Sequence, residues 1–389
     1  MTFSVRLLSC AAALALGGAV VFGPHGAGAR SGSANRDPQP AVAPGFVVRV
    51  IAHIDRPREM FVTSTGELMV ATLGNSVYAI DDAERGVKAP RVFTSVDDAP
   101  VAGIAQGANS LFIGSQHGVW RIPFHDGDRR PEADPKKIAS FRTRGGRGHV
   151  TTSLAFANGQ LYASVGSSCN ACTETDPTRA TTQEMVPDGS GMHAKAVHIR
   201  NAIALGTNPV TGNVWAGVAG QDELEHGHPY EIFDPVTAHA GTVNYGWPDC
   251  YENRRPVHPG IDCSQMTVAR VVFPAYETPV GVAIYPRSPH GSDAFPDAYR
   301  GGAFVALHGS WHTPPIAPRV VFVALHGDDP ARGVNWNDPS SQWTEFLGGF
   351  QPSGSSRIGR PSGVAVGPHG SLFVADDLAG VIYRITPAH

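Results

Sequence analysis

This chain of 389 residues is poor in charge and in long apolar runs. Only 16% of its residues are charged and its net charge is −4, so it has no basic excess that would attract nucleic acid or an anionic membrane. After residue 30 no apolar stretch is long enough to span a bilayer or to build a helical bundle. Cysteine is scarce, with five residues, and no Cys-x-x-Cys-His segment for haem attachment is present.

Turn-forming residues are abundant instead, with 45 Gly and 32 Pro, and they punctuate a phrase that recurs along the chain. In each copy a turn with Gly or Asn leads into four or five alternating apolar residues. The six copies lie at 65–80, 108–122, 158–167, 211–220, 301–311 and 369–385. Strand pairs repeated at intervals of about forty to ninety residues are typical of a β-propeller. We therefore predict an all-β fold, a six-bladed β-propeller over 45–389, in which each copy forms the inner part of one blade.

The two ends of the predicted propeller are expected to meet. The segment GFVVRVIA at 45–52 alternates like a strand, and the last copy lies close to the end of the sequence. Pairing of these segments would close the ring and cover strand edges that would otherwise be open to aggregation.

The first residues read as an export signal. Arg6 is the only charge before a run of Leu, Ala, Val and Gly that reaches Phe22, and Ala27-Gly28-Ala29 fits a small-x-small cleavage site. We expect a signal peptide over 1–29, a flexible leader over 30–44, and a periplasmic or secreted protein. In the LLSC segment at 7–10 only two apolar residues precede Cys10, which argues against lipidation there.

Four cysteines remain after this cleavage, and an even number in an oxidising compartment predicts two disulfides. Of the three connectivities, local pairing of Cys169 with Cys172 and of Cys250 with Cys263 is the simplest. A zinc site at 169–172 would need a second ligand pair, and haem attachment would need His where Thr173 stands.

A propeller carries its chemistry on the loops at one face, so candidate residues are sought between the copies. His149 ends a basic, Gly-rich segment before the third copy, where it would lie at the mouth of the channel. Imidazole is the side chain best suited to accept a proton near neutral pH. Arg200-Asn201 precedes the fourth copy, and Arg357 and Arg360 precede the last. A guanidinium fork suits carboxylate or quinone oxygens.

Two further candidate segments directly follow copies of the repeated phrase. Acidic residues follow the fourth copy, among them Asp222 and Glu223, and hard oxygens of this kind bind calcium, although the same cluster also reads as a solvated turn. His308, Trp311 and His312 leave the fifth copy together. Pro314 and Pro315 argue against the helix that would let the two histidines share a metal.

Several motifs in order give the chain a family resemblance. They are LYASVGSSCNAC, RNAIAL, NPVTGNVWAGVAGQDEL, YGWPDC, FPDAYRGGAFVALHGSW and GRPSGVAVGPHGSLFVADDLAGVIYRI. Together they resemble the soluble PQQ-dependent sugar dehydrogenases, in particular the glucose/sorbosone dehydrogenase family, over about 45–387. The resemblance implies a six-bladed propeller that binds pyrroloquinoline quinone (PQQ) and Ca²⁺ and oxidises a sugar or polyol. Because the chain has no haem motif, the electron acceptor would be a separate molecule.

The resemblance also implies roles for individual residues. His149 matches the general base, Arg200 and Asn201 a pair that lines the cofactor, and Arg360 an arginine near the quinone carboxylates. Trp311 and His312 fall near a lysine that contacts the cofactor in the family. The calcium turn matches the four residues Gly220, Gln221, Asp222 and Glu223.

Some positions depart from the family. Gly148 stands where the best-known members have Asp, and GQDELEHG stands where sorbosone-type members have a run like GRDELGDD. These changes predict weaker calcium binding. Two alternatives therefore stay open: a glycan- or protein-binding propeller that has lost the cofactor, and a metal-dependent lactonase, which would need convergent Glu, Asn and Asp at the channel floor. The substrate and the oligomeric state do not follow from the sequence.

Overall fold

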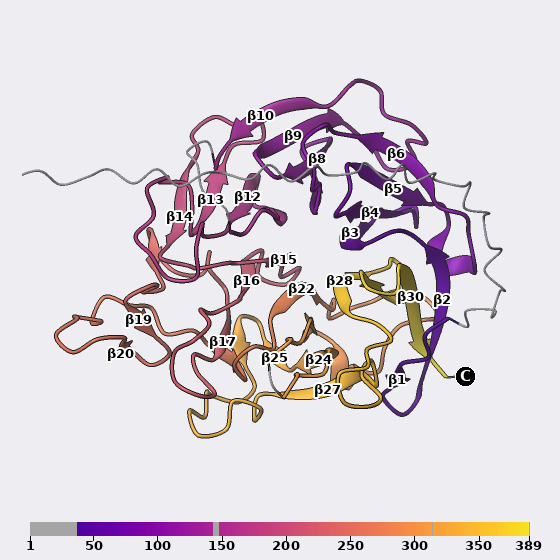
Figure 1. Cartoon of the computed structure of the whole chain (residues 1–389). Coiled ribbons are helices and arrows are strands. Elements are labelled where there is room, and N and C mark those ends of the chain that lie inside the picture. Colours follow the sequence, from indigo (N-terminus) through magenta and orange to yellow (C-terminus); the bar gives the residue numbers. More distant parts are fainter. Residues whose placement is uncertain (1–36, 143–147, 313, 389) are drawn as a thin grey trace, which may run out of the picture. The chain divides into compact units, whose positions relative to one another are not determined.

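The computed structural model describes residues 37–142, 148–312 and 314–388. Within them, six antiparallel sheets of four main strands are arranged as blades around a central channel (Figure 1). The predicted all-β, six-bladed propeller is therefore confirmed. The expected signal peptide, Cys10 and residues 30–36 of the expected leader lie outside the described residues.

In each blade the strand named first lines the channel, and the others follow outward in order. Blade 1 is β3 (Pro57–Val62), β4 (Leu68–Thr72), β5 (Ser76–Ile80) and β6 (Arg91–Ser95). Blade 2 is β7 (Gly103–Gly107), β8 (Ser110–Ser115), β9 (Gly118–Pro123) and β10 (Lys136–Ser140). Blade 3 is β11 (Leu154–Ala157), β12 (Gln160–Val165), β13 (Thr181–Met185) and β14 (His193–Val197).

Blade 4 is β15 (Ala204–Thr207), β16 (Val214–Val218), β17 (Glu231–Asp234) and β21 (Val271–Phe273). Blade 5 is β22 (Pro279–Ile284), β23 (Ala303–Leu307), β24 (Arg319–Val323) and β27 (Trp343–Gly348). Blade 6 is β28 (Pro361–Val366), β29 (Leu372–Asp376), β30 (Val381–Pro387) and β2 (Phe46–His53).

The last blade takes its outer strand from the start of the described chain. β2 pairs antiparallel with β30, in a register that sets Val48 opposite Ile385. This pairing confirms the expected closure of the ring. β1 (Ala41–Val42) also pairs, with β27 of blade 5. Strand pairing therefore begins at residue 41, four residues before the expected start of the propeller.

The repeated phrase coincides with the second strand of each blade, and in three copies it continues into the third. Second strands such as β4, β16, β23 and β29 are buried along their whole length, because each packs between neighbouring blades. Burial on both faces requires a nearly continuous apolar run, and this is why the phrase can be recognised in the sequence. The channel strands precede the phrase and carry more varied residues.

A long insertion between β17 and β21 explains the widest gap between copies. It contains β18 (Val243–Asn244), which pairs with β14 of blade 3, and the hairpin of β19 (Cys250–Tyr251) and β20 (Arg255–Pro256). The Cys250–Cys263 disulfide closes this hairpin region, and the second disulfide joins Cys169 to Cys172. Both predicted pairings are confirmed.

The remaining elements are small. The 3-10 helices are η1 (Ala83–Arg85) and η2 (Asp297–Tyr299), and the strands β25 (Leu325–His326) and β26 (Asp329–Pro330) form a hairpin in blade 5. No helix among the described residues is long and apolar enough to cross a membrane.

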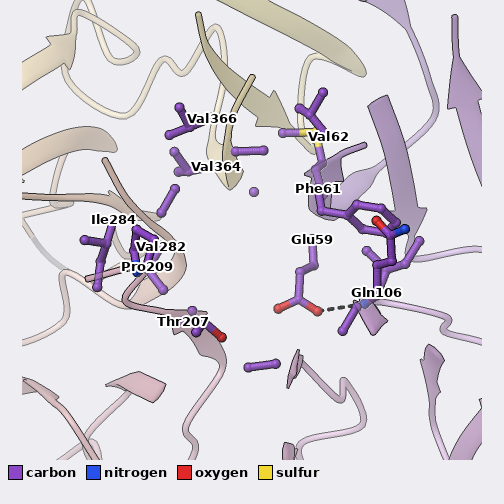
Figure 2. A pocket seen from close by; sticks show the side chains of 18 of the residues that line it. Glu59, Phe61, Val62, Gln106, Thr207, Pro209, Val282, Ile284, Val364 and Val366 are labelled. Carbon is purple, nitrogen blue, oxygen red and sulfur yellow. Dashed lines mark hydrogen bonds between the residues drawn. The ribbon is translucent and has the colours of Figure 1, made fainter. Parts of the chain in front are cut away.

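The six channel strands enclose a cavity of about 560 Å³. Figure 2 shows its mainly apolar wall, with the Glu59 carboxylate projecting from β3. That carboxylate accepts the backbone N–H groups of Ile104 and Leu154, at 2.8 and 2.9 Å. Burial raises the pKa of Glu59 to about 8, so this carboxyl group is mostly protonated at neutral pH.

Candidate functional site

The predicted site residues lie on loops at one end of the channel, not along it. His149, the pair Arg200-Asn201, and Arg360 precede the channel strands of blades 3, 4 and 6. Residues 220–223 and 311–312 follow the second strands of blades 4 and 5. In an antiparallel blade these two kinds of loop emerge at the same end. Backbone hydrogen bonds join them, from Ser167 N to Arg200 O at 2.8 Å and from Asp377 N to Arg360 O at 3.1 Å.

His149 is held by the loop that follows β12. Its Nδ1 lies 3.1 Å from the carbonyl oxygen of Ser167 and 3.1 Å from the Ser167 hydroxyl. A carbonyl oxygen can only accept, so this contact assigns the hydrogen to Nδ1 and the lone pair to Nε2. Burial, followed by the nearby charge of Arg200, lowers the pKa of His149 to about 4. The imidazole is therefore neutral at pH 7 and can accept a proton at Nε2.

Two glycines allow this arrangement. Gly148 has φ +91°, and a Cβ there would lie 2.5 Å from Ser167 O. An aspartate side chain at this position would require a backbone shift. A Cβ on Gly166 would lie 2.4 Å from Asn201 Oδ1 and 2.6 Å from His149 Cβ, so Gly166 lets these two side chains meet.

Asn201 carries an unpaired polar atom. The residue is buried, and its Oδ1 has no hydrogen-bond partner among the described residues. Its main chain is fixed, because its carbonyl accepts the Ala219 N–H at 2.9 Å. A buried acceptor without a partner is costly, so Asn201 offers a hydrogen-bonding position to a donor within the site.

Arg200 is committed to the protein itself. Its Nε donates to Asn170 O at 3.0 Å, and its Nη1 donates to the carbonyls of Ala219 and Gly220. Its Nη2 donates to Asn170 Oδ1 at 2.9 Å and to Asp222 Oδ2 at 3.3 Å. These contacts use every nitrogen of the guanidinium, whose side chain is 9% exposed. Arg200 therefore ties two loops together and contributes a buried positive charge.

The predicted calcium turn presents one carboxylate toward the site. Asp222 lies between Arg200 and His312, whose Nε2 is 3.6 Å from Asp222 Oδ1. Gly220 donates its N–H to the buried Glu231, and burial raises the pKa of that carboxyl to about 7. Gln221 is buried, and Glu223 adopts φ +65°. Within the part of the chain that the structure describes, no three ligating side chains converge at 220–223.

Arg360 and Trp311 form an aromatic–cation pair at the mouth of the channel. The Arg360 guanidinium carbon lies 4.1 Å from the centroid of the Trp311 ring, and that of Arg357 lies 5.3 Å from it. Arg360 donates to the carbonyls of His308 and Gly309, at 3.0 and 3.2 Å. Its Nη1 has no acceptor among the described residues. Trp311 is 74% exposed, so this pair can receive a planar or anionic ligand.

The two histidines of the fifth copy diverge. His308 Nε2 donates to Asp377 at 2.9 Å, and Asp377 also accepts Arg58 at 2.8 Å. His312 instead stacks on Tyr276, with ring centroids 3.8 Å apart. The structure therefore does not bring His308 and His312 together as metal ligands.

Sequence reasoning missed three supporting groups. Arg58 and Asp377 form the buried ion pair behind Arg360, but they are 319 positions apart, so spacing could not join them. Tyr276 precedes a channel strand, as His149 does, and this position is the only feature of the sequence that could have marked it as a site residue. Asn170 contacts both Arg200 and Asp222, and it lies within the Cys-x-x-Cys segment that the sequence marked only as a disulfide.

Within the described ranges, the channel cavity does not hold the Glu, Asn and Asp set that a lactonase would need. Among the described residues that line the channel cavity, Glu59 is the only carboxylate, and none is Asn or Asp. The fold and loops define a six-bladed propeller with a neutral histidine, buried arginines and an exposed tryptophan around one end of the channel. The chain belongs to the TrAA12-like family, whose model matches residues 40–388. This membership confirms the family resemblance that the motifs indicated.

Solved structures share the fold. A calcium structure of Trichoderma reesei Carbohydrate-Active Enzymes Family AA12 superposes with a TM-score of 0.74 at 18% identity, covering 91% of this chain and 98% of that one. The holo form of the pyranose dehydrogenase PQQ domain from Coprinopsis cinerea gives 0.73 at 18% identity, covering 90% and 98%. The PQQ-bound aldose sugar dehydrogenase of Streptomyces coelicolor gives 0.60 at 16% identity, covering 89% and 99%.

A sequence relative is an uncharacterized protein of Borreliella burgdorferi, 25% identical over 202 residues. The matched region spans 49% of this chain and about half (48%) of that relative.

Proposed function

We propose that the protein is an exported quinoprotein dehydrogenase that oxidises a sugar or polyol hydroxyl. The observation that carries the proposal is His149, which is neutral, fixed through Nδ1, and free to accept a proton at Nε2. Family membership and the PQQ-containing structural neighbours supply the cofactor class. When bound, PQQ would supply the hydride acceptor for the substrate carbon.

The residues of this chain divide the remaining work. His149 Nε2 takes the hydroxyl proton of the substrate. Arg360 would hold a carboxylate of the cofactor through its unpaired Nη1, and Trp311 would pack against the ring system. His312 lies beside the Asp222 carboxylate, and Asn201, whose buried Oδ1 has no partner among the described residues, would line the cofactor. Arg200 supplies positive charge without direct contact, because its own donors are occupied.

Calcium is the second cofactor of the proposal. Asp222 and backbone carbonyls of 220–223 are the proposed ligands, and Gly220 O and Asp222 are already contacted by Arg200. An ion would have to displace these contacts, so we expect weak affinity, with Ca²⁺ acting as a Lewis acid where it binds.

Export is part of the proposal. Residues 1–29 would be removed as a signal peptide, and the two disulfides suit an oxidising compartment. Sequencing the amino terminus of the mature protein should give Arg30 as its first residue. A mature protein that begins at Met1 would contradict this part.

The test is reconstitution with PQQ and Ca²⁺, followed by absorption spectra and by dye reduction with a panel of sugars and polyols. His149→Ala should bind PQQ as the wild type does and lose about 10²–10⁴-fold in turnover, the usual contribution of a general base. His258→Ala, which changes an exposed histidine, is the matched control. If wild-type protein fails to bind PQQ, the dehydrogenase proposal is wrong.

Two observations favour a second candidate, a glycan-binding propeller without cofactor. Arg200 is fully paired, while Trp311 presents an exposed ring of the kind that stacks on sugars. In that case calorimetry would show oligosaccharide binding in the absence of PQQ, and Trp311→Ala would abolish it.

A further inference from the structure

A single asparagine connects the separate parts of the site. Asn170 lies between β12 and β13, in the four-residue segment closed by the Cys169–Cys172 disulfide. Its amide nitrogen donates to Asp222 O at 2.9 Å, and its amide oxygen accepts the Asp222 N–H at 2.8 Å. The Asn170 side chain, from blade 3, thus forms two hydrogen bonds with the backbone of Asp222 in the predicted calcium turn of blade 4.

The same residue also holds Arg200. The Asn170 amide oxygen accepts Arg200 Nη2 at 2.9 Å, and the Asn170 carbonyl accepts Arg200 Nε at 3.0 Å. The indole N–H of Trp247 donates to that carbonyl as well, at 3.1 Å. Without these contacts Arg200 would keep only its bonds to Ala219, Gly220 and Asp222.

Neighbouring contacts fix the segment that carries Asn170. The Ser167 hydroxyl donates to Cys169 O at 2.7 Å, and the same serine faces the ring of His149. Glu174 accepts both the N–H and the hydroxyl of Ser168, at 2.6 and 2.8 Å. The disulfide closes the ring around Asn170, so a continuous set of contacts runs from His149 through this ring to Arg200 and Asp222.

We infer that Asn170 is a positioning residue for the cofactor site, and that the Cys169–Cys172 disulfide holds it in place. The inference rests on the proposed function, because it assigns Arg200 and Asp222 to that site. It gives the disulfide a role beyond stability. Reduction of the disulfide would loosen the contacts of Asn170 with Arg200 and Asp222 and so weaken cofactor binding, while the propeller stays folded.

The first experiment needs no cofactor. Crystal structures of wild type, Asn170→Ala and the control Asn253→Ala, which changes an exposed asparagine, are compared without PQQ. We expect the Arg200 guanidinium and the 220–223 turn to shift only in Asn170→Ala. Unchanged positions in that variant would overturn the inference, whether or not the protein binds PQQ.

The second experiment measures PQQ affinity by fluorescence quenching. Asn170→Ala should bind at least tenfold more weakly, because Arg200 and the 220–223 turn lose the hydrogen bonds that hold them, while the propeller stays folded in the absence of ligand. Asn170→Asp keeps the acceptor for Arg200 Nη2, so it should recover part of the affinity. Equal affinity in wild type and Asn170→Ala would overturn the inference, whereas no binding by wild type would contradict the proposed function and leave the crystallographic comparison to decide.

The disulfide is tested with a matched pair of variants. Cys169→Ser/Cys172→Ser should lose PQQ affinity and show the same displacement of Arg200 in its structure. Cys250→Ser/Cys263→Ser removes the other disulfide, whose closed segment 250–263 is fully described and forms no hydrogen bond with Asn170, and should keep Arg200 in place. An undisturbed Arg200 in the first variant would show that the disulfide has no part in positioning.

Discussion

The depressed pKa of His149 makes a quantitative prediction for stability. In the unfolded chain the imidazole has its ordinary pKa of about 6.5, and in the folded protein burial and Arg200 lower it to about 4. Between these values the unfolded state binds more protons than the folded state. The contribution of neutral His149 to stability is therefore complete above pH 6.5 and is lost as the pH falls toward 4. Between pH 7 and pH 5 this loss amounts to about 2 kcal/mol in the free energy of unfolding.

The assay is equilibrium denaturant unfolding at pH 7 and pH 5 with wild type, His149→Ala and His258→Ala. The difference between the two pH values should be about 2 kcal/mol smaller for His149→Ala than for wild type, because alanine cannot titrate. His258→Ala should keep the wild-type difference. If His149→Ala shows the same pH dependence as wild type, His149 is not held neutral by its surroundings, and its assignment as a proton acceptor loses its physical basis.

Three other perturbations test the structure. Gly148→Asp should destabilise the protein by at least about 2 kcal/mol more than Gly127→Asp in chemical denaturation, since both glycines have positive φ but only Gly148 faces backbone atoms within 3 Å. Arg360→Ala should weaken PQQ binding about tenfold in a quenching titration, and Arg332→Ala, an exposed arginine, should leave it unchanged. Deletion of 46–53 exposes the edge of β30, so soluble monomer should disappear in size-exclusion chromatography, and a well-folded deletion variant would refute closure by β2.

The predictable parts of the fold are those that depend on a local sequence pattern, such as an apolar run, an alternation or a short separation between cysteines. Second strands are buried on both faces and so produce a recurring apolar phrase, and the closing strand shows clear alternation at 45–52. Local disulfide pairing follows from short separations of 3 and 13 residues. The start of the described pairing at Ala41 was missed, because a two-residue strand leaves no periodicity to detect.

The site was predictable as a set of loops but not as a set of contacts. His149, Arg200 and Arg360 could be placed at one end of the channel, since each precedes a channel strand. Whether an arginine faces a ligand or the protein depends on which carbonyl groups surround it, and these come from distant loops. Asn170, which accepts from Arg200 across 30 positions, therefore had no signal in the sequence.

Arg200 and Arg360 differ in whether their hydrogen-bond donors are occupied by the protein, and this difference distinguishes two sides of the site. Arg200, in blade 4, donates hydrogen bonds to Asn170, to Asp222 and to two further carbonyl groups. It therefore holds the loops near His149 together. Arg360, in blade 6, keeps one nitrogen without a partner among the described residues and lies against the exposed Trp311. Blades 3 and 6 stand opposite each other in a ring of six, so a ligand held by Arg360 and reacting at His149 must bridge the channel mouth. In the proposed reaction, an anionic cofactor anchored on one side, with the proton acceptor on the other, would meet this geometric demand, and the buried charge of Arg200 would stabilise negative charge that develops between them.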